Sequence, residues 1–486
     1  MKKITPFRIL GFMMLVFISL SVIMILFTYL FPKGIQFSPS FSLRFPSVSD
    51  MFNNKGINYA NIDDVLNRKK DSTLLRELHS LDDSLRAFRE ISLSNPSRIH
   101  YPKSNKRILH NFFDALENVE ERQGTLRIMH YGDSQIEMDR ITGYVREQLQ
   151  IRFGGSGPGL HPPVQVIPST SIRQSSGGSW RRYACWGMDT DLRANHKRYG
   201  LMLNMSEYTD HANITFTLSH QSYERAKMIN RVKVLIGNLE SVATVSLSAH
   251  GKTYGTQQAT PGKALHILEW ELDTFPKTIT LQFSGGGSPE VYGIALDGKS
   301  GVSVDNLPMR GCSGTIFTRA DSALLKESFE ALNVKLLILQ FGGNMMPSIK
   351  GEKNAADYGR KFYDQIMYLR SLKKDLSILV IGLADMSKRI DGQMQSYPYI
   401  EDVRNNLKKA TFDAKGAYWD MLDVMGGINS MPAWVEQGLA GKDYIHFTNK
   451  GAQKIAELFF EALMNDYNEY RIEKRIEAIH DLKQQP

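Results

Sequence analysis

The stretch "TLRIMHYGDSQIEMDR", residues 125–140, joins an apolar run to a polar turn. The run has the length and the β-favouring composition of a buried strand. A helical segment, "QIEMDRITGYVREQLQIRF", follows the turn. Strand, turn and helix predict one β-α unit of a parallel sheet. Ser134, in the turn, is either a helix cap or, if a base lies nearby in the fold, a nucleophile.

Two later segments repeat the pattern of a buried strand. "NVKLLILQFGGN", residues 333–344, and "DLSILVIGLADMS", residues 375–387, are nearly continuous apolar runs that end in small or polar residues. Strands of a parallel sheet are covered on both faces and have this composition. The fold class predicted is α/β, with its site at the carboxyl ends of the strands. Asp385, at the third strand end, lines this cleft or caps a helix.

Residues 163–298 have a different pattern, with short alternating runs between turn residues and almost no helical periodicity. Examples of these runs are "NITFTLSH", "RVKVLIGN", "ATVSLSAHG" and "KTITLQFSGG". They predict an all-β sandwich. Because α/β segments lie on both sides, we expect an insertion rather than an appended domain.

The N-terminus has the pattern of a membrane anchor. Residues 1–8 carry Lys2, Lys3 and Arg8, and residues 9–31 carry no charge. About 20 apolar residues cross a bilayer as a helix. A cleaved signal peptide has a shorter apolar region and a small-residue cleavage site, so an uncleaved anchor is favoured. The positive charges place the N-terminus in the cytoplasm and the rest of the chain outside, which in a bacterium is the periplasm.

Residues 32–122 are interpreted as a linker with membrane-proximal helices, and residues 471–486 as a charged C-terminal helix or tail. The chain has 59 Lys and Arg against 51 Asp and Glu, spread without a long block, and no nucleic-acid motif accompanies them. Its two cysteines, Cys185 and Cys312, could form one bridge, but two separately buried thiols are favoured. No ligand spacing for a metal appears, and no cofactor is expected.

Near the C-terminus, "GKDYIHFTNKG" places Asp443 three residues before His446. A carboxylate at this spacing can hold one imidazole nitrogen while the other accepts a proton from a serine hydroxyl. "FGGNMM" offers the Asn344 amide as a donor to a tetrahedral intermediate. "NLPMRGCSGTIFT" offers loop amides at Gly311 and Gly314. Each motif alone is weak evidence for catalysis, but together they form an ordered set.

This ordered set resembles the SGNH, or GDSL-like, hydrolase superfamily over about residues 125–160 and 299–465. The resemblance implies a flavodoxin-like three-layer α/β/α fold, with its first part at 123–162 and its second at 299–470. It implies Ser134 as nucleophile, His446 as base and Asp443 as orienting acid. For the oxyanion hole it implies the Ser134 and Gly314 amides and the Asn344 side chain.

The run from Trp419 to His446 is similar to that of bacterial peptidoglycan O-acetylesterases, which carry an inserted β-sandwich resembling a carbohydrate-binding module. The chain departs from the family at Gln135, where leucine is usual, and at Met345. Further candidate substrate contacts are Asp133, Gly311, Gly343 and Trp180. The tryptophan is included because its flat indole face suits a sugar ring.

The sequence therefore predicts a serine esterase, anchored in the inner membrane, that removes O-acetyl groups from cell-envelope polysaccharide or another acetylated carbohydrate. One alternative is an O-acetyltransferase that passes the acetyl group to a glycan and works with a membrane-bound acyltransferase. A second is an inactive glycan-binding scaffold.

Overall fold

The computed structural model describes residues 6–31, 35–38, 41–43, 80–87, 89–90, 95, 97–119, 124–187 and 189–484. By internal contacts the chain divides into two compact units, Met1–Glu77 and Leu78–Pro486. Most of the expected linker lies outside the described residues. Residues 80–87 are helical.

The first unit contains helix α1 (Pro6–Leu30) and a short antiparallel pair, β1 (Ile35–Ser38) and β2 (Phe41–Leu43). Within α1, the segment Leu10–Phe27 has a mean hydropathy of 2.7, and by length and composition it can cross a membrane. Nearly all of its described side chains are exposed. A helix with apolar side chains on every face has no polar side to turn toward water.

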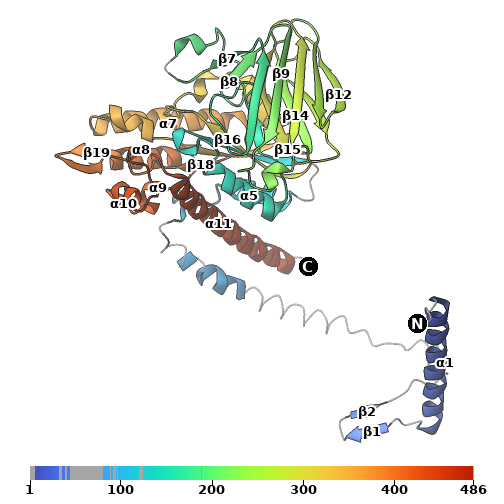
Figure 1. Ribbon diagram of the computed structural model, residues 1–486. Coiled ribbons are helices and arrows are strands. Elements are labelled where there is room, and N and C mark those ends of the chain that lie inside the picture. Colours follow the sequence, from blue (N-terminus) through green and yellow to red (C-terminus); the bar gives the residue numbers. More distant parts are fainter. Residues whose placement is uncertain are drawn as a thin grey trace. The chain divides into compact units, whose positions relative to one another are not determined.

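The second unit is built on a six-stranded sheet with five parallel strands (Figure 1). In spatial order the strands are β16 (Gly301–Pro308), β4 (Thr125–Gly132), β17 (Val334–Gln340), β18 (Ser377–Ile381), β21 (Ala417–Trp419) and the antiparallel edge strand β3 (Ile99–His100). This confirms the α/β class with a parallel sheet, and the three apolar runs expected to be strands are β4, β17 and β18.

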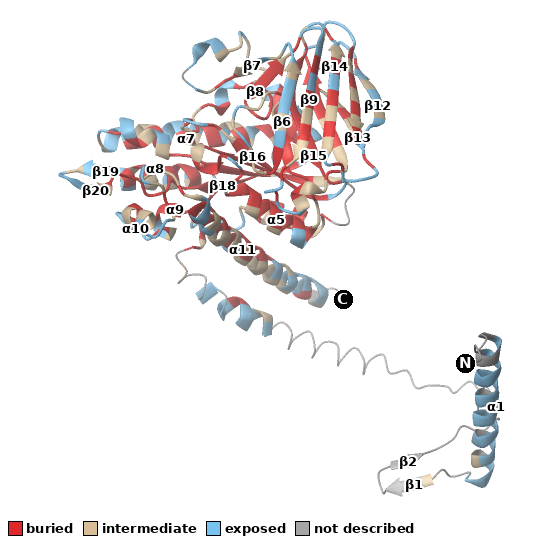
Figure 2. Ribbon diagram, in the orientation of Figure 1, coloured by how far each residue is buried: buried red, intermediate tan, exposed pale blue. Residues whose placement is uncertain are grey.

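Helices cover both faces of this sheet. Side chains on its two faces belong to two separate hydrophobic cores, and each core also contains side chains from helices. In β4, Met129 and Tyr131 belong to one core, and Leu126 and Ile128 to the other. The first core is closed by α6 (Ser322–Ala331), α7 (Glu352–Leu372) and α8 (Ile400–Asp413). The second is closed by α4 (His110–Glu117), α5 (Thr142–Phe153) and the long α11 (Asn449–Gln484). Figure 2 shows the buried strands between these helices.

Residues 159–297 form two antiparallel sheets that share a third core. One has the order β12 (Lys252–Ala259), β11 (Ala243–Ala249), β14 (Thr278–Gly285), β9 (His211–Leu218) and β6 (Ile172–Gly178). The other has the order β13 (His266–Glu271), β10 (Arg231–Gly237), β15 (Glu290–Asp297), β8 (Asn204–Glu207) and β7 (Arg181–Ala184), with β5 (Gly159–His161) also paired to β15. The chain leaves the parallel sheet after α5 and returns to it at β16.

Strand β15 is buried along its whole length. Val291 and Ile294 face the core between the antiparallel sheets, whereas Tyr292 and Ala295 pack into the core that α6 and α7 close. The antiparallel sheet that contains β15 therefore joins the two parts of the unit by a shared apolar interface.

A buried ion cluster lies at this junction. The Arg127 guanidinium, on β4, donates to Asp297 at the end of β15 and to Asp305 on β16, and all three side chains are essentially inaccessible. The Leu160 N–H also donates to Asp305 at 2.8 Å. The loss of one member of such a cluster is costly, because it leaves a buried charge unpaired.

The remaining elements lie near the carboxyl ends of the parallel strands. They are the hairpin β19 (Ser387–Ile390) and β20 (Gln393–Ser396) and the short helices α9 (Met421–Val424) and α10 (Ser430–Glu436). Single 3₁₀ turns are η1 (Ser134–Ile136), η2 (Thr190–Leu192), η3 (Arg225–Lys227), η4 (Phe317–Arg319) and η5 (Gly343–Ser348). Cys185 and Cys312 are free and buried, as the sequence favoured, and burial raises the pKa of each thiol to about 12.

Candidate active site

A cavity of about 570 Å³ opens at the carboxyl ends of β4, β17 and β18. Its lining includes Ser134 and His446, together with Asn344 and Gly343 after β17. The polar residues that follow separate strands meet here because parallel strands end at one edge of their sheet.

Ser134 is the first residue of η1, and one residue, Asp133, separates it from the end of β4. Asp133 caps this turn, because its Oδ1 accepts the Gln135 N–H at 3.0 Å. The cap is therefore Asp133, and the Ser134 hydroxyl is left to contact His446, with 2.8 Å between Oγ and Nε2. The structure thus assigns the cap to Asp133 and leaves the role of Ser134 to its contact with His446.

His446 lies in the loop before α11, and Asp443 orients its ring. The distance from Nδ1 to Asp443 Oδ2 is 2.7 Å. An ionised carboxylate only accepts hydrogen bonds, so Nδ1 carries the ring proton and Nε2 of the neutral ring is free to accept one. The sequence-predicted Ser134, His446 and Asp443 therefore form one continuous hydrogen-bonded chain.

The Asp443 carboxylate is held by more than the imidazole. Its Oδ1 accepts the backbone N–H groups of Ile445 and His446, both at 3.0 Å. Partial burial alone would raise the pKa of Asp443, but the hydrogen bonds from the His446 ring and from these amides outweigh it and hold the pKa below its usual value. Asp443 is thus charged at neutral pH.

Asp133 has the opposite electrostatic character. Burial raises its pKa to about 6. The hydrogen bond from the Gln135 N–H, the charge of His446 and the hydrogen bond from the Asn344 side chain lower the pKa but do not outweigh burial. Its Oδ2 accepts from Asn344 Nδ2 at 3.2 Å. The same amide nitrogen also donates to the Cys312 carbonyl at 3.2 Å. Asp133 therefore connects the serine turn to the asparagine loop.

The two glycines of the loop after β16 are placed differently. Gly311 is exposed and lines the cavity, with φ of +74°. Gly314 is buried, and its N–H donates to Cys312 Sγ at 3.3 Å. A side chain at Gly314 would lie 2.7 Å from the Phe341 ring. The structure thus brings Gly311, and not Gly314, to the cavity.

Trp180 lies away from this cavity. It packs edge-on against Tyr208 and Phe283 at the core between the antiparallel sheets, and its Nε1 donates to the Asn213 carbonyl at 3.2 Å. The core position explains this tryptophan without a ligand. Asp385 is also buried, and it accepts from Ser396 Oγ at 2.5 Å and from the Met431 N–H at 2.7 Å, so it joins the β19–β20 hairpin to α10.

Three charged residues of the cavity were not identified from the sequence. Arg310 forms a bidentate pair with Glu137, with both distances at 2.6 Å, and two thirds of the Arg310 side chain is exposed at the cavity. Arg140 lies beside the serine turn. Charged residues in turns are common, so no sequence pattern distinguished these three from solvated surface charges.

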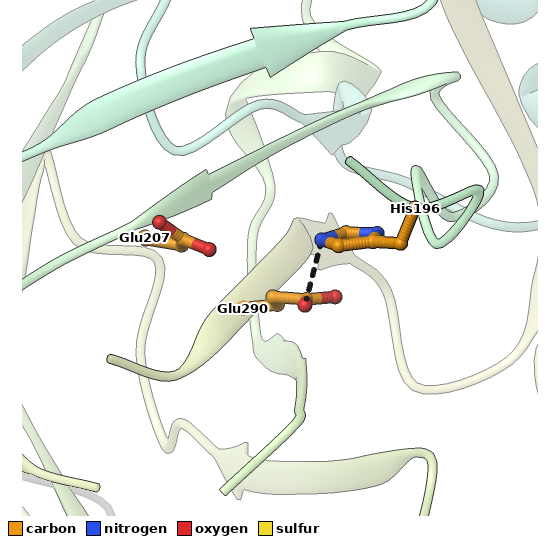
Figure 3. Close-up of side chains that lie close together, drawn as sticks. All are labelled: His196, Glu207 and Glu290. Atoms are coloured by element: carbon orange, nitrogen blue, oxygen red, sulfur yellow. Dashed lines mark ion pairs between the residues drawn. The ribbon is translucent and has the colours of Figure 1, made fainter. Parts of the chain in front are cut away.

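One cluster of metal-ligating side chains occurs among the described residues, formed by His196, Glu207 and Glu290 (Figure 3). His196 Nε2 lies 3.2 Å from Glu290 Oε1. The buried Glu290 carboxylate also accepts from Nε and Nη2 of Arg198 and, at 2.9 Å, from the Tyr292 hydroxyl. Because a guanidinium already neutralises Glu290 and contacts both its oxygens, the donor set does not suit a cation.

Comparison with known proteins gives matches only among solved structures, since no family model and no curated protein matches. A structure titled "Peptidoglycan O-acetylesterase in action, 5 min" is 22% identical, covers 74% of this chain and 96% of that chain, and has a TM-score of 0.60. A family two carbohydrate esterase from Cellvibrio japonicus is 8% identical, covers 62% of this chain and 99% of that chain, and has a TM-score of 0.24. The chain therefore shares the fold of that peptidoglycan O-acetylesterase structure, as the sequence resemblance implied.

Proposed function

We propose that this protein is a serine esterase that removes O-acetyl groups from cell-envelope polysaccharide. The observation that carries the proposal is the chain from Ser134 Oγ to His446 Nε2, at 2.8 Å, and from His446 Nδ1 to Asp443, at 2.7 Å, inside an open cavity. A nucleophile, a base and an orienting acid in this order are the groups that acyl transfer requires.

In the proposed reaction, Ser134 Oγ attacks the acetyl carbonyl carbon while His446 Nε2 takes the hydroxyl proton. The tetrahedral intermediate then expels the sugar oxygen, which receives that proton from His446, and the acetyl group stays on Ser134. His446 next takes a proton from water, whose oxygen attacks the acetyl-serine. Collapse returns the proton to Ser134 Oγ and releases acetate.

The oxyanion would be held by donors around the serine turn. The Ser134 N–H belongs to the first residue of η1, where a helical amide has no partner within its own helix. Asn344 lines the same cavity, and to hold the oxyanion its Nδ2 would exchange one of its present hydrogen bonds, to Asp133 or to the Cys312 carbonyl, for one to the substrate oxygen. For the third donor, we propose the Gly311 N–H in place of Gly314, since only Gly311 lines the cavity.

The proposed substrate class rests on the fold and on the shape of the site. The structure with the matching fold is titled as a peptidoglycan O-acetylesterase. The cavity is open and much larger than an acetyl group, which suits an ester carried on a polymer. We propose that the two antiparallel sheets act as an inserted sandwich that contacts the glycan, and that α1 anchors the site to the membrane with the catalytic unit outside the cytoplasm.

The test compares Ser134→Ala with wild type on an aryl acetate and on O-acetylated peptidoglycan, with acetate release as the readout. We expect turnover of both substrates to fall by at least about 10³-fold. Ser313→Ala is the matched control, because Ser313 lies in the loop after β16 but does not line the cavity. Equal turnover by Ser134→Ala and wild type would exclude the proposal.

Transfer of the acetyl group to a glycan acceptor uses the same three residues. The apolar helix α1 is the observation that supports transfer as a second candidate function, because a helix in the membrane would bring the site near a membrane-bound acyl donor. Acetylated sugar formed when an acceptor glycan is added would favour transfer, and release of acetate alone would favour hydrolysis. Covalent labelling of Ser134 by a fluorophosphonate would exclude an inactive glycan-binding scaffold.

A further inference from the structure

We propose that Gln135 is a positioning residue that sets the distance between Ser134 Oγ and His446 Nε2. This inference rests on the proposed function, because it assigns a role within the same Ser134–His446–Asp443 site. Gln135 immediately follows Ser134 in η1, and only 8% of it is exposed.

The Gln135 side chain contacts the backbone on both sides of His446. Its Nε2 donates to the Ile445 carbonyl at 2.7 Å. Its Oε1 accepts the Phe447 N–H at 3.4 Å. One primary amide thus pairs with the two residues that flank the base, as a neighbouring strand would. A leucine at position 135 could make neither bond.

Arg140 makes a second connection between the same two segments. It donates to the Ser134 carbonyl at 2.7 Å, to the Phe447 carbonyl at 2.9 Å and to the Glu137 carbonyl at 3.0 Å. Burial lowers the pKa of Arg140, although the charges of nearby carboxylates raise it. The guanidinium joins the carbonyl of the nucleophile to the residue after the base.

The other backbone bonds of the loop do not set its distance from the serine. The Gly441 N–H donates to His446, the Tyr444 N–H to Gly441, and the Ser387 N–H to Tyr444. These bonds shape the loop and attach it to β19, but none reaches the Ser134 turn. Gln135 and Arg140 therefore supply the fixed links between segments that lie more than 300 residues apart in sequence.

A displacement of a base by about 1 Å costs on the order of 10²-fold in rate. We therefore expect Gln135→Met, which keeps the length and loses both hydrogen bonds, to lower kcat on an aryl acetate by about 10- to 100-fold with little change in KM. The rate of fluorophosphonate labelling at Ser134 falls by the same factor. Gln365→Met is the matched control, since Gln365 is 5% exposed and bonds to Thr318 away from the cavity.

A double-mutant cycle with His446→Ala separates positioning from a general structural effect. If Gln135 acts through His446, Gln135→Met has less than about a twofold effect on the residual turnover of His446→Ala. A loss of equal size in both backgrounds would overturn the inference. So would a wild-type labelling rate in Gln135→Met.

Two further measurements keep the test decisive. If Gln135→Met lowers Tm more than the control does, Arg140→Lys takes its place. One ammonium cannot span the Ser134 and Phe447 carbonyls. We expect the same loss of kcat from Arg140→Lys and the same result in the double-mutant cycle with His446→Ala. Wild-type protein that neither hydrolyses the ester nor labels at Ser134 would refute the proposed function. Wild type that labels, with Gln135→Met and Arg140→Lys labelling equally fast, would refute only the positioning role.

Discussion

The pKa values of two carboxylates near Ser134 are shifted in opposite directions, and the surroundings of each carboxylate explain the difference. Asp443 is nearly half exposed and receives hydrogen bonds from the His446 ring and two amides, which lower its pKa. Asp133 is buried, and burial raises its pKa to about 6. A protonated, neutral Asp443 would no longer stabilise the positive charge of a protonated His446 ring, whereas burial favours the protonated form of Asp133.

The raised pKa of Asp133 predicts a pH-dependent contribution to stability. Between the ordinary aspartate pKa of 3.8 and the raised pKa of about 6, the unfolded chain ionises at this position while the folded protein keeps the proton. The contribution is therefore complete below pH 3.8 and is lost as the pH rises toward 6. Asp133→Asn cannot ionise, so its free energy of unfolding relative to wild type should rise by on the order of 3 kcal/mol between pH 4 and pH 7.

Denaturant unfolding of both proteins at several pH values measures this difference. The lost hydrogen-bond acceptor in Asp133→Asn adds an offset that does not depend on pH, so the slope is the observable. A slope of zero, or a fall between pH 4 and pH 7, would contradict the assignment.

At the scale of elements, the junction between the parallel and antiparallel sheets combines an apolar interface with one buried charge cluster. Strand β15 places side chains in two cores, and Arg127 on β4 holds the carboxylates of Asp297 and Asp305. The pKa of Asp305 is raised to about 6 because burial, together with the charge of Asp297, outweighs Arg127. The cluster is sensitive to the loss of its single cation.

We predict that Arg127→Met destabilises the second unit by about 3 to 5 kcal/mol, because it leaves two carboxylates buried without a counter-charge. Arg107→Met is the control, since the Arg107–Glu477 pair is more than half exposed and should change stability by less than about 0.5 kcal/mol. The free energy of unfolding from urea titration measures both. Similar values for the two variants would show that the cluster does not stabilise the junction.

At the scale of the whole molecule, the chain separates into a unit with an apolar helix and a unit with the candidate site. All residues of the cavity belong to Leu78–Pro486. The apolar segment Leu10–Phe27 belongs to the other unit. The candidate site and the apolar segment therefore belong to different parts of the sequence.

We predict that a protein starting at Leu78 remains in the soluble fraction and keeps kcat on an aryl acetate within about twofold of the full chain, because removal of an apolar helix leaves the core of the second unit intact. The full chain should pellet with membranes. Its intact mass should include residues 1–31, because an anchor is retained and a signal peptide is removed. A mass that begins after residue 31 would establish cleavage.

Much of the fold could be predicted because burial on two faces leaves a readable pattern. The apolar runs at Leu126–Tyr131, Val334–Gln340 and Ser377–Ile381 are strands of the parallel sheet. The alternating runs between residues 163 and 298 are antiparallel strands. The roles of Gln135 and Arg140 could not be predicted, because both act through backbone atoms of a loop distant in sequence.

The sequence by itself determined the strands, the apolar N-terminal helix and the residue types required for acyl transfer, since each depends on local composition or spacing. Only the tertiary structure decided which of those residues meet. It brought Ser134 and His446 to 2.8 Å, turned the Gly314 amide onto Cys312 and placed Gly311 at the cavity. The physical reason is that hydrogen bonding depends on direction over about 3 Å, and loop backbones fix that direction only after the strands have packed.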